Sequence, residues 1–102
     1  MGLFDFLTTD IGIDLGTANT LIVYNDEVMV NQPSIVAVDR MSGKVIAIGE
    51  EAQQMHEKTH EKYKTIRPLR DGVIADFTVA EAMIQGMIKL IPRKRWLFNN
   101  SY

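Results

Sequence analysis

The segment from Asp10 to Val23, DIGIDLGTANTLIV, holds the residues whose types and spacing best suit chemistry. At its centre, Gly16-Thr17-Ala18-Asn19-Thr20 offers successive backbone N–H groups and hydroxyls, which are donors suited to phosphate oxygens. The glycine lets a ligand come close to the backbone. Asp14 lies just before this turn, and Mg²⁺ is bound through carboxylates, waters and phosphates. The segment therefore predicts a site for nucleotide phosphates and a hydrated Mg²⁺.

The same turn also has a simpler interpretation. A β-hairpin with Gly and Asn in its turn is common, and such a turn needs no ligand. Two other phosphate-binding motifs are excluded, because the sequence has no G-x-x-x-x-G-K-[ST] and no G-x-G-x-x-G that opens a helix. Spacing alone leaves both interpretations of the turn open.

Two strands, over residues 10–16 and 19–24, are expected to position this turn. Side chains alternate between the faces of a strand. The first strand would therefore have an apolar face and a small, acidic face, formed respectively by Ile11, Ile13 and Leu15 and by Gly12, Asp14 and Gly16.

Further strands are predicted over residues 27–31, 34–39 and 44–49, which gives an antiparallel meander. By composition, Asn25-Asp26 and Met41-Ser42-Gly43 are hairpin connections. Pro33 belongs at a strand entry or edge, because proline cannot donate to a ladder.

Two helices are expected after the strands. The first runs from Glu50 to about Lys58, with Ala52 and Met55 as its buried positions. The second runs from about Val79 to Ile91 and ends at Pro92. For this second helix, Thr78 as N-cap and Glu81 three residues later predict a capping box.

Composition indicates one small globular piece: 102 residues, 46% hydrophobic, 24% charged, with a net charge of −2. This charge does not suggest nucleic-acid binding. Without cysteine, the chain has no disulfide framework and no thiolate metal site. His56 and His60 have a spacing that can bind metal on a helix, but their polar segment offers no obvious third ligand, which favours a solvated surface.

Three motifs in order, IGIDLGTANTLIV, then NQPSI at 31–35 and IRPLRDGVIADF at 66–77, resemble the beginning of the MreB family of bacterial actin homologues. That family belongs to the actin and Hsp70 ATPase superfamily. The resemblance extends from Asp10 to about Ile91.

The resemblance implies an α+β fold, partial α/β, as the N-terminal part of an actin-like or ribonuclease H-like ATPase domain with a mixed sheet and flanking helices. Residues 10–91 would form the first portion of actin-like domain I, including its small subdomain. Residues 1–9 would be an N-terminal tail that can contact a membrane, and residues 92–102 a truncated basic and aromatic tail. Gly86 would let the second helix approach the larger sheet of that domain closely.

The resemblance also implies ATP and Mg²⁺ as ligands. Gly16, Thr17, Ala18, Asn19 and Thr20 would contact the β- and γ-phosphates, and Asp14 would face Mg²⁺ through water. Arg70, Asp71 and Gly72 would form a nucleotide-sensing hinge. Members of the family are several times longer than this chain, and phosphoryl transfer needs several convergent groups. We therefore expect no appreciable ATPase activity from the 102 residues alone.

The implied function is an ATP-dependent cytoskeletal filament that determines rod shape by organising cell-wall synthesis. Its partners would be copies of itself and cell-wall elongation proteins, without nucleic acid. It would lie in the cytoplasm at the inner face of the cytoplasmic membrane, with residues 1–7 on the membrane surface. Two alternatives stay open: another ATPase of the superfamily, such as a sugar kinase or chaperone, and a non-enzymatic module that binds a membrane or partner.

Overall fold

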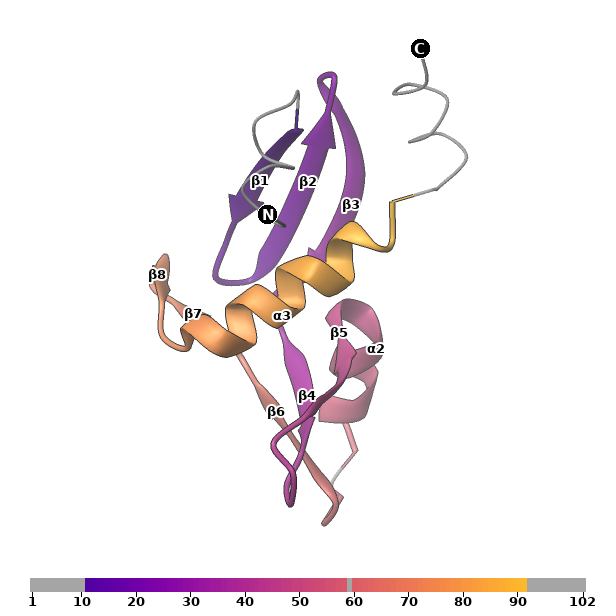
Figure 1. Ribbon diagram of the computed structural model, residues 1–102, viewed down its shortest axis with the longest axis vertical. Coiled ribbons are helices and arrows are strands. Elements are labelled where there is room, and N and C mark those ends of the chain that lie inside the picture. The colour runs from indigo at the N-terminus through magenta and orange to yellow at the C-terminus, as the bar shows by residue number, and fades with distance from the viewer. Residues whose placement is uncertain (1–10, 59, 92–102) are drawn as a thin grey trace.

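The structure, a computed structural model, describes residues 11–58 and 60–91. The predicted tails at 1–9 and 92–102 lie outside the described residues. Figure 1 shows a three-stranded sheet at one end, a second sheet with a short helix at the other end, and a longer helix crossing between them. The α+β class is confirmed, and every strand pair in the described part is antiparallel.

The first sheet consists of β1 (Ile11–Leu15), β2 (Asn19–Tyr24) and β3 (Glu27–Pro33), in the order β1-β2-β3. Asn25 and Asp26 connect β2 to β3 with φ values of 51° and 62°. Two consecutive left-handed residues make the turn whose twist matches an antiparallel hairpin. The predicted connection is therefore confirmed.

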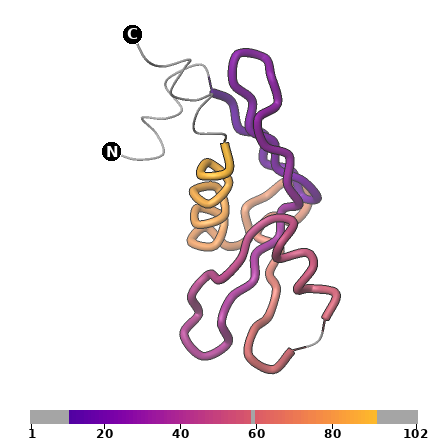
Figure 2. Tube along the Cα trace, turned by 90° about the vertical axis from the view of Figure 1, so that its right-hand side faces the viewer, coloured from indigo at the N-terminus to yellow at the C-terminus, as the bar shows by residue number. Residues whose placement is uncertain are grey.

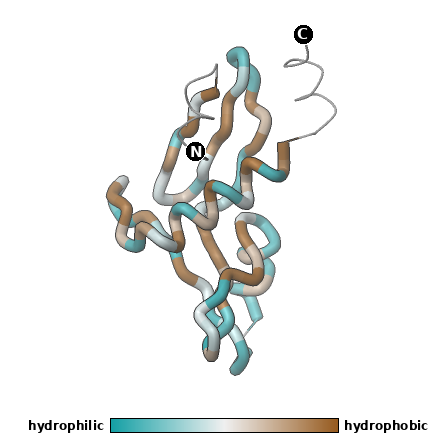
Figure 3. Tube along the Cα trace, in the orientation of Figure 1, coloured by the Kyte–Doolittle hydropathy of each residue, from teal (hydrophilic) through white to brown (hydrophobic). Residues whose placement is uncertain are grey.

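The second sheet has the order β5-β4-β6 and consists of β4 (Val36–Asp39), β5 (Val45–Ile48) and β6 (Tyr63–Ile66). The predicted turn between β4 and β5 is confirmed. It is held by Asp39, whose Oδ1 accepts hydrogen bonds from the backbone N–H groups of Met41 and Ser42 at 2.8 and 3.2 Å. The turns at this end of the molecule are mostly hydrophilic (Figure 3), although Met41 in the β4–β5 turn is 97% exposed.

The single meander predicted for all five strands is wrong between β3 and β4, where the chain leaves one sheet and enters the other. Pro33 ends β3 on the sheet's edge and has no N–H to continue a ladder. The N–H of Ser34 then donates to the carbonyl of Ala18 at 2.8 Å, which turns the chain toward the β1–β2 connection. Strand β6, which completes the second sheet, was not predicted.

Helix α2 (Gly49–His56) follows β5 directly, and Ala52 is fully buried as predicted, with Met55 packed beside it. Gly49 opens the helix with φ at 63°. The next N–H, of Glu50, donates to Oε1 of Gln32 at 2.7 Å. A side chain of the first sheet therefore satisfies an N-terminal donor of a helix on the second sheet.

A small hairpin of β7 (Leu69–Arg70) and β8 (Val73–Ile74) leads into helix α3 (Phe77–Ile88). The predicted N-cap at Thr78, and with it the capping box to Glu81, is wrong. Asp76 is the N-cap, and its Oδ1 accepts a hydrogen bond of 3.0 Å from the N–H of Val79. A carboxylate three residues before a backbone N–H satisfies one N-terminal donor of the helix, which is one of the two bonds of a capping box.

Helix α3 packs where the two sheets meet, as the side view in Figure 2 shows. Met83 and Met87 are fully buried in one core with residues of both sheets, among them Ile22 and Val36. A Cβ on Gly86 would lie 3.1 Å from Cγ1 of Ile48, so glycine permits a close approach here. That approach is to β5 of the second sheet.

Neither of the described helices, α2 or α3, has the length and apolar character needed to cross a bilayer. Apolar side chains are nevertheless exposed near the start of α3, where Val73 is 65% and Phe77 66% exposed. Figure 3 correspondingly shows a hydrophobic stretch in the β7–β8 hairpin.

Candidate nucleotide-phosphate site

The connection between β1 and β2 is a tight loop. Gly16 donates its N–H to the carbonyl of Asn19 at 3.0 Å, which closes the loop around Thr17 and Ala18. A Cβ on Gly16 would lie 2.5 Å from that carbonyl oxygen, so no larger residue fits without a shift of the backbone. Thr17 and Ala18 are exposed, and within residues 11–58 and 60–91 their N–H groups have no acceptor. Two adjacent unpaired donors are suited to an anion.

Asp14 and Asn19 lie on the same face of the first sheet. Asp14 pairs with Leu21 across the ladder, and Asn19 is two residues before Leu21 in β2, so alternation places all three on one side. Asp14 is exposed, and no described residue bonds to its carboxylate. The side-chain amide of Asn19 donates to Oδ1 of Asn31 at 3.4 Å. The loop therefore has a carboxylate and a neutral amide on its open side.

Thr20 is separated from these residues, because it points to the opposite face and is fully buried. Its hydroxyl lies 2.7 Å from the hydroxyl of Ser34, which donates its own proton to the carbonyl of Gly16 at 2.7 Å. Since Ser34 has one proton, the Thr20 hydroxyl is the donor in the first contact. The structure therefore brings together Asp14 and residues 16–19 and sets the Thr20 side chain behind the loop.

Ser34 is a residue of the candidate site that was not predicted from the sequence. Besides its hydroxyl contacts, its N–H donates to the carbonyl of Ala18, so one buried residue fixes both ends of the loop. The available signal was a small polar residue directly after Pro33, at the head of the apolar run Ile35 to Val38. A hydroxyl in such a buried position needs a partner.

The predicted hinge residues also reach the loop. The N–H of Gly72 donates to Oγ1 of Thr17 at 2.8 Å. Asp71 and Gly72, with φ values of 53° and 76°, form the two-residue turn of the β7–β8 hairpin. Arg70 is the last residue of β7 and pairs with Val73. The β1–β2 loop, residues 16–19, is called the phosphate-suited loop below. The turn of the β7–β8 hairpin is therefore joined to it directly by this hydrogen bond.

The residues present fit a hydrated Mg²⁺ that is held mainly by phosphates. The described residues include no group of three His, Cys, Asp or Glu side chains placed for a metal ion. Asp14 supplies one carboxylate, and Mg²⁺ commonly takes one or two carboxylates together with phosphates and waters. His56 and His60 have other partners: the ring of His56 contacts the hydroxyl of Thr65, and Nδ1 of His60 accepts from the N–H of Lys62 at 3.0 Å.

The amino-acid sequence of this chain is similar to those of known proteins. A family model described as MreB/Mbl protein matches residues 8–101. The cell shape-determining protein Mbl of Bacillus subtilis is 58% identical over 80 residues, which cover 78% of this chain and 24% of that protein. The cell shape-determining protein MreB of Escherichia coli is 47% identical over 89 residues, covering 82% and 26%. The chain thus spans about a quarter of the length of these relatives.

Solved structures agree with this result. The crystal structure of MreB5 of Spiroplasma citri bound to AMPPNP has a TM-score of 0.70 and 38% identity, covering 76% of this chain and 24% of that one. The ADP-bound form of MreB5 has a TM-score of 0.71 and 35% identity, covering 85% and 26%. The model, the relatives and the folds agree, and this chain belongs to the MreB/Mbl family.

Proposed function

We propose that this chain contributes the first phosphate-binding loop of an ATP-dependent, actin-like protein. The observation that carries the proposal is the pair of N–H groups on Thr17 and Ala18 beside the carboxylate of Asp14, all without a partner among residues 11–58 and 60–91. The MreB5 structures with this fold contain AMPPNP and ADP, which supports a nucleotide as the ligand.

Residues 16–19 would contact the β- and γ-phosphates. Gly16 lets the phosphates approach, and the N–H groups of Thr17 and Ala18 donate to them. The Thr17 hydroxyl accepts from Gly72 and still has its own proton to donate to a phosphate oxygen. The amide of Asn19 adds a neutral donor. Thr20, which the resemblance expected to contact phosphate, has its hydroxyl bonded to Ser34 and would support the loop from behind.

Asp14 would hold Mg²⁺ through water on the same face as Asn19. The ion, when bound, offsets negative charge on the phosphates. The hydrogen bond from Gly72 to Thr17 gives the Arg70–Gly72 turn a physical route for sensing the loop. A ligand that draws the Thr17 hydroxyl toward itself changes this bond.

For the whole protein we infer a filament that determines cell shape by organising cell-wall synthesis, because the relatives are named for shape determination. Self-association and contacts with cell-wall elongation proteins belong to this proposal. So does a location in the cytoplasm, at the inner face of the membrane.

A chimaera tests the nucleotide proposal. Residues 11–91 replace the matching segment of Bacillus subtilis Mbl, which supplies the remaining length. In this chimaera Asp14→Asn should weaken binding of ATP in the presence of Mg²⁺ by about tenfold, as expected when one charge-assisted contact of ~1.4 kcal/mol is lost. With EDTA in place of Mg²⁺, the variant should bind ATP at least as tightly as the parent, because asparagine removes a negative charge that faces the phosphates.

Asp26→Asn is the matched control, since Asp26 is an exposed turn residue whose φ of 62° asparagine also tolerates. It should leave ATP affinity unchanged. An Asp14→Asn chimaera that binds Mg·ATP as tightly as the parent would remove Asp14 from the proposed site.

Membrane contact through residues 1–7 has a separate test, which is pelleting of the chain with liposomes before and after deletion of residues 1–9. Four apolar side chains in this segment, Leu3, Phe4, Phe6 and Leu7, supply a surface for the bilayer interface. Deletion should reduce pelleting. Equal pelleting of both forms would count against this role.

A further inference from the structure

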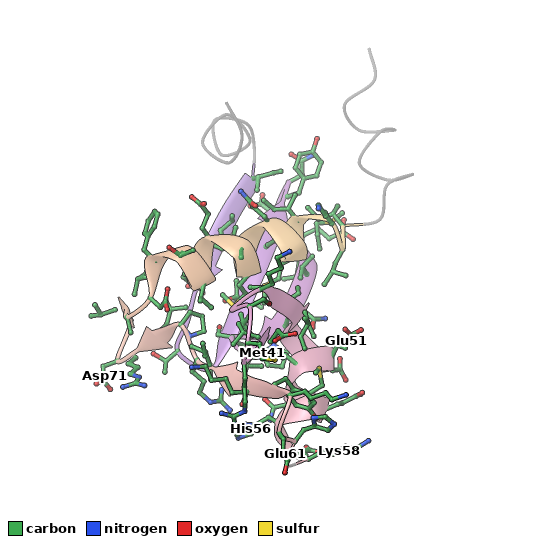
Figure 4. The ribbon with its side chains drawn as sticks, turned by 60° about the horizontal axis from the view of Figure 1, so that its bottom comes forward. Met41, Glu51, His56, Lys58, Glu61 and Asp71 are labelled. Atoms are coloured by element: carbon green, nitrogen blue, oxygen red, sulfur yellow. The ribbon has the colours of Figure 1, made fainter. Side chains whose placement is uncertain are left out.

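A second candidate site lies next to the phosphate-suited loop and shares Thr17 with it. It is an open groove of about 670 Å³ between α2 and the segment that runs from β6 into β7. Asp71 and His56, both labelled in Figure 4, are among the residues that line it. This volume is typical of small-molecule pockets.

The floor of the groove is apolar. Ile35 and Leu69 are each 1% exposed, and Ile66 is half-buried between them and solvent. All three are held by backbone pairing. Ile66 pairs with Val36 in the second sheet, Leu69 pairs with Ile74 in the hairpin, and the carbonyl of Ile35 accepts from the N–H of Gly49 at 2.9 Å. The floor is therefore fixed before any ligand arrives.

The wall of the groove is cationic. Lys64, Arg67 and Arg70 line it at three-residue intervals and are exposed, and Asp71 is the only carboxylate among its described lining residues. Within the described part of the chain, no acidic or polar group pairs with the side-chain nitrogens of these three cations. The chain as a whole has a net charge of −2, so this concentration of unpaired positive charge is local.

We propose that this groove binds a small organic anion that carries an apolar body, such as a phosphate monoester or a carboxylate on a hydrophobic group. The apolar body would cover Ile35, Ile66 and Leu69. The acidic group would meet the guanidinium groups of Arg67 and Arg70, whose planar donors suit phosphate and carboxylate oxygens. Of residues 16–19, only Thr17 lines the groove, although Arg70 and Asp71 also belong to the turn to which the proposed function assigns nucleotide sensing. Binding in the groove needs no nucleotide at the loop, so the two proposals can be tested separately.

Occupancy of the groove has a consequence for the loop. Thr17 and Asp71 line the groove, and the N–H next to Asp71, that of Gly72, bonds Thr17. A ligand in the groove would contact Thr17 and Asp71, which lie on either side of the Gly72–Thr17 hydrogen bond. It could therefore change the conformation of the loop without binding in it.

Amide chemical shifts of the 102-residue chain, recorded in a titration, test the proposal with three probes. Phenyl phosphate has the charge and the apolar body, inorganic phosphate has the charge alone, and benzylammonium has the body with the opposite charge. Phenyl phosphate should give saturable shifts at Thr65, Ile66 and Leu69. Inorganic phosphate should bind at least about threefold more weakly, because it leaves the apolar floor exposed to water. Benzylammonium should give no saturable shifts there.

The variant pair Arg67→Gln and Arg70→Gln should weaken phenyl phosphate binding by about tenfold or more, which corresponds to losing charge-assisted hydrogen bonds. The matched control replaces Lys44 and Lys89, two exposed cations outside the groove lining, by Gln and should bind phenyl phosphate like the parent. Lys64→Gln, on β6, repeats the test if the arginine pair impairs folding.

Three results would overturn the proposal. One is equal binding of phenyl phosphate and benzylammonium, and another is unchanged affinity in both the arginine pair and Lys64→Gln. The third is a set of shifts confined to residues 16–19, which would assign phenyl phosphate to the loop alone. That last result would leave the nucleotide proposal intact, so the two proposals fail separately.

Discussion

The N–H of Gly72 donates a hydrogen bond of 2.8 Å to Oγ1 of Thr17, across 55 residues of sequence. Thr17 lies in the β1–β2 loop and Gly72 in the turn of the β7–β8 hairpin. The hairpin in turn is tied to the start of α3, because the N–H of Asp76, the N-cap of α3, donates to the carbonyl of Pro68 at 3.4 Å. A change in the conformation of the β1–β2 loop can therefore reach α3, which packs against both sheets, through the Thr17–Gly72 hydrogen bond and the β7–β8 hairpin.

Replacement of Thr17 by valine should release the Gly72 amide. Valine keeps the shape of threonine but offers no acceptor, so the amide loses a bond of about 0.5–1.5 kcal/mol. Hydrogen exchange of Gly72, followed by NMR, should accelerate by roughly two- to tenfold. Thr17→Ser keeps the oxygen and should exchange like the parent. Equal exchange rates in parent and Thr17→Val would show that the bond is absent in solution.

Ser34→Ala should lower the stability of the chain. The substitution leaves the carbonyl of Gly16 and the hydroxyl of Thr20 without their buried partner. A buried polar group left unsatisfied costs about 1–3 kcal/mol. Urea denaturation should report that loss, whereas Ser42→Ala in the exposed β4–β5 turn should stay within about 0.5 kcal/mol of the parent. Similar stabilities for the two variants would argue that the Ser34 hydroxyl does not stabilise the loop.

Gly16→Ala and Gly12→Ala form a matched pair. A Cβ at Gly16 meets the backbone oxygen of Asn19 at 2.5 Å, whereas a Cβ at Gly12 has nothing within 4 Å. Overpacking costs about 1–3 kcal/mol, so thermal or urea unfolding should show that loss for Gly16→Ala. Gly12→Ala should be neutral or stabilising by up to about 1 kcal/mol, because glycine weakens a strand interior. A neutral Gly16→Ala variant would mean that the loop relaxes readily.

The sequence predicted the first sheet well because its signals are local and repeated. Ile11, Ile13 and Leu15 alternate with small or acidic residues, and Asn25-Asp26 supplies the left-handed turn that a two-residue hairpin needs. Asp71-Gly72 has the same turn chemistry, yet its hairpin was missed. The strands beside it contain two residues each, too few to show an alternating pattern.

The remaining differences depend on contacts between distant residues. The break between the sheets is set by the bond from Ser34 to Ala18, and no local pattern encodes that pairing. The burial of Thr20 also depends on Ser34, which lies 14 residues away. Residue types therefore indicated the members of the candidate site, whereas tertiary contacts decided which of them face the open side.

The start of α3 offers a direct choice between two capping residues. Asp76 accepts from the N–H of Val79 at 3.0 Å, while Thr78 lies inside the helix as its second residue and is exposed. Asp76→Ala should therefore destabilise the chain by about 0.5–2 kcal/mol, the usual effect of losing an N-cap. Thr78→Ala should be neutral or slightly stabilising, since alanine is the better helix former. Urea denaturation of both variants measures the difference. If Thr78→Ala causes the larger loss, the helix begins two residues later in solution and the capping box predicted from the sequence is restored.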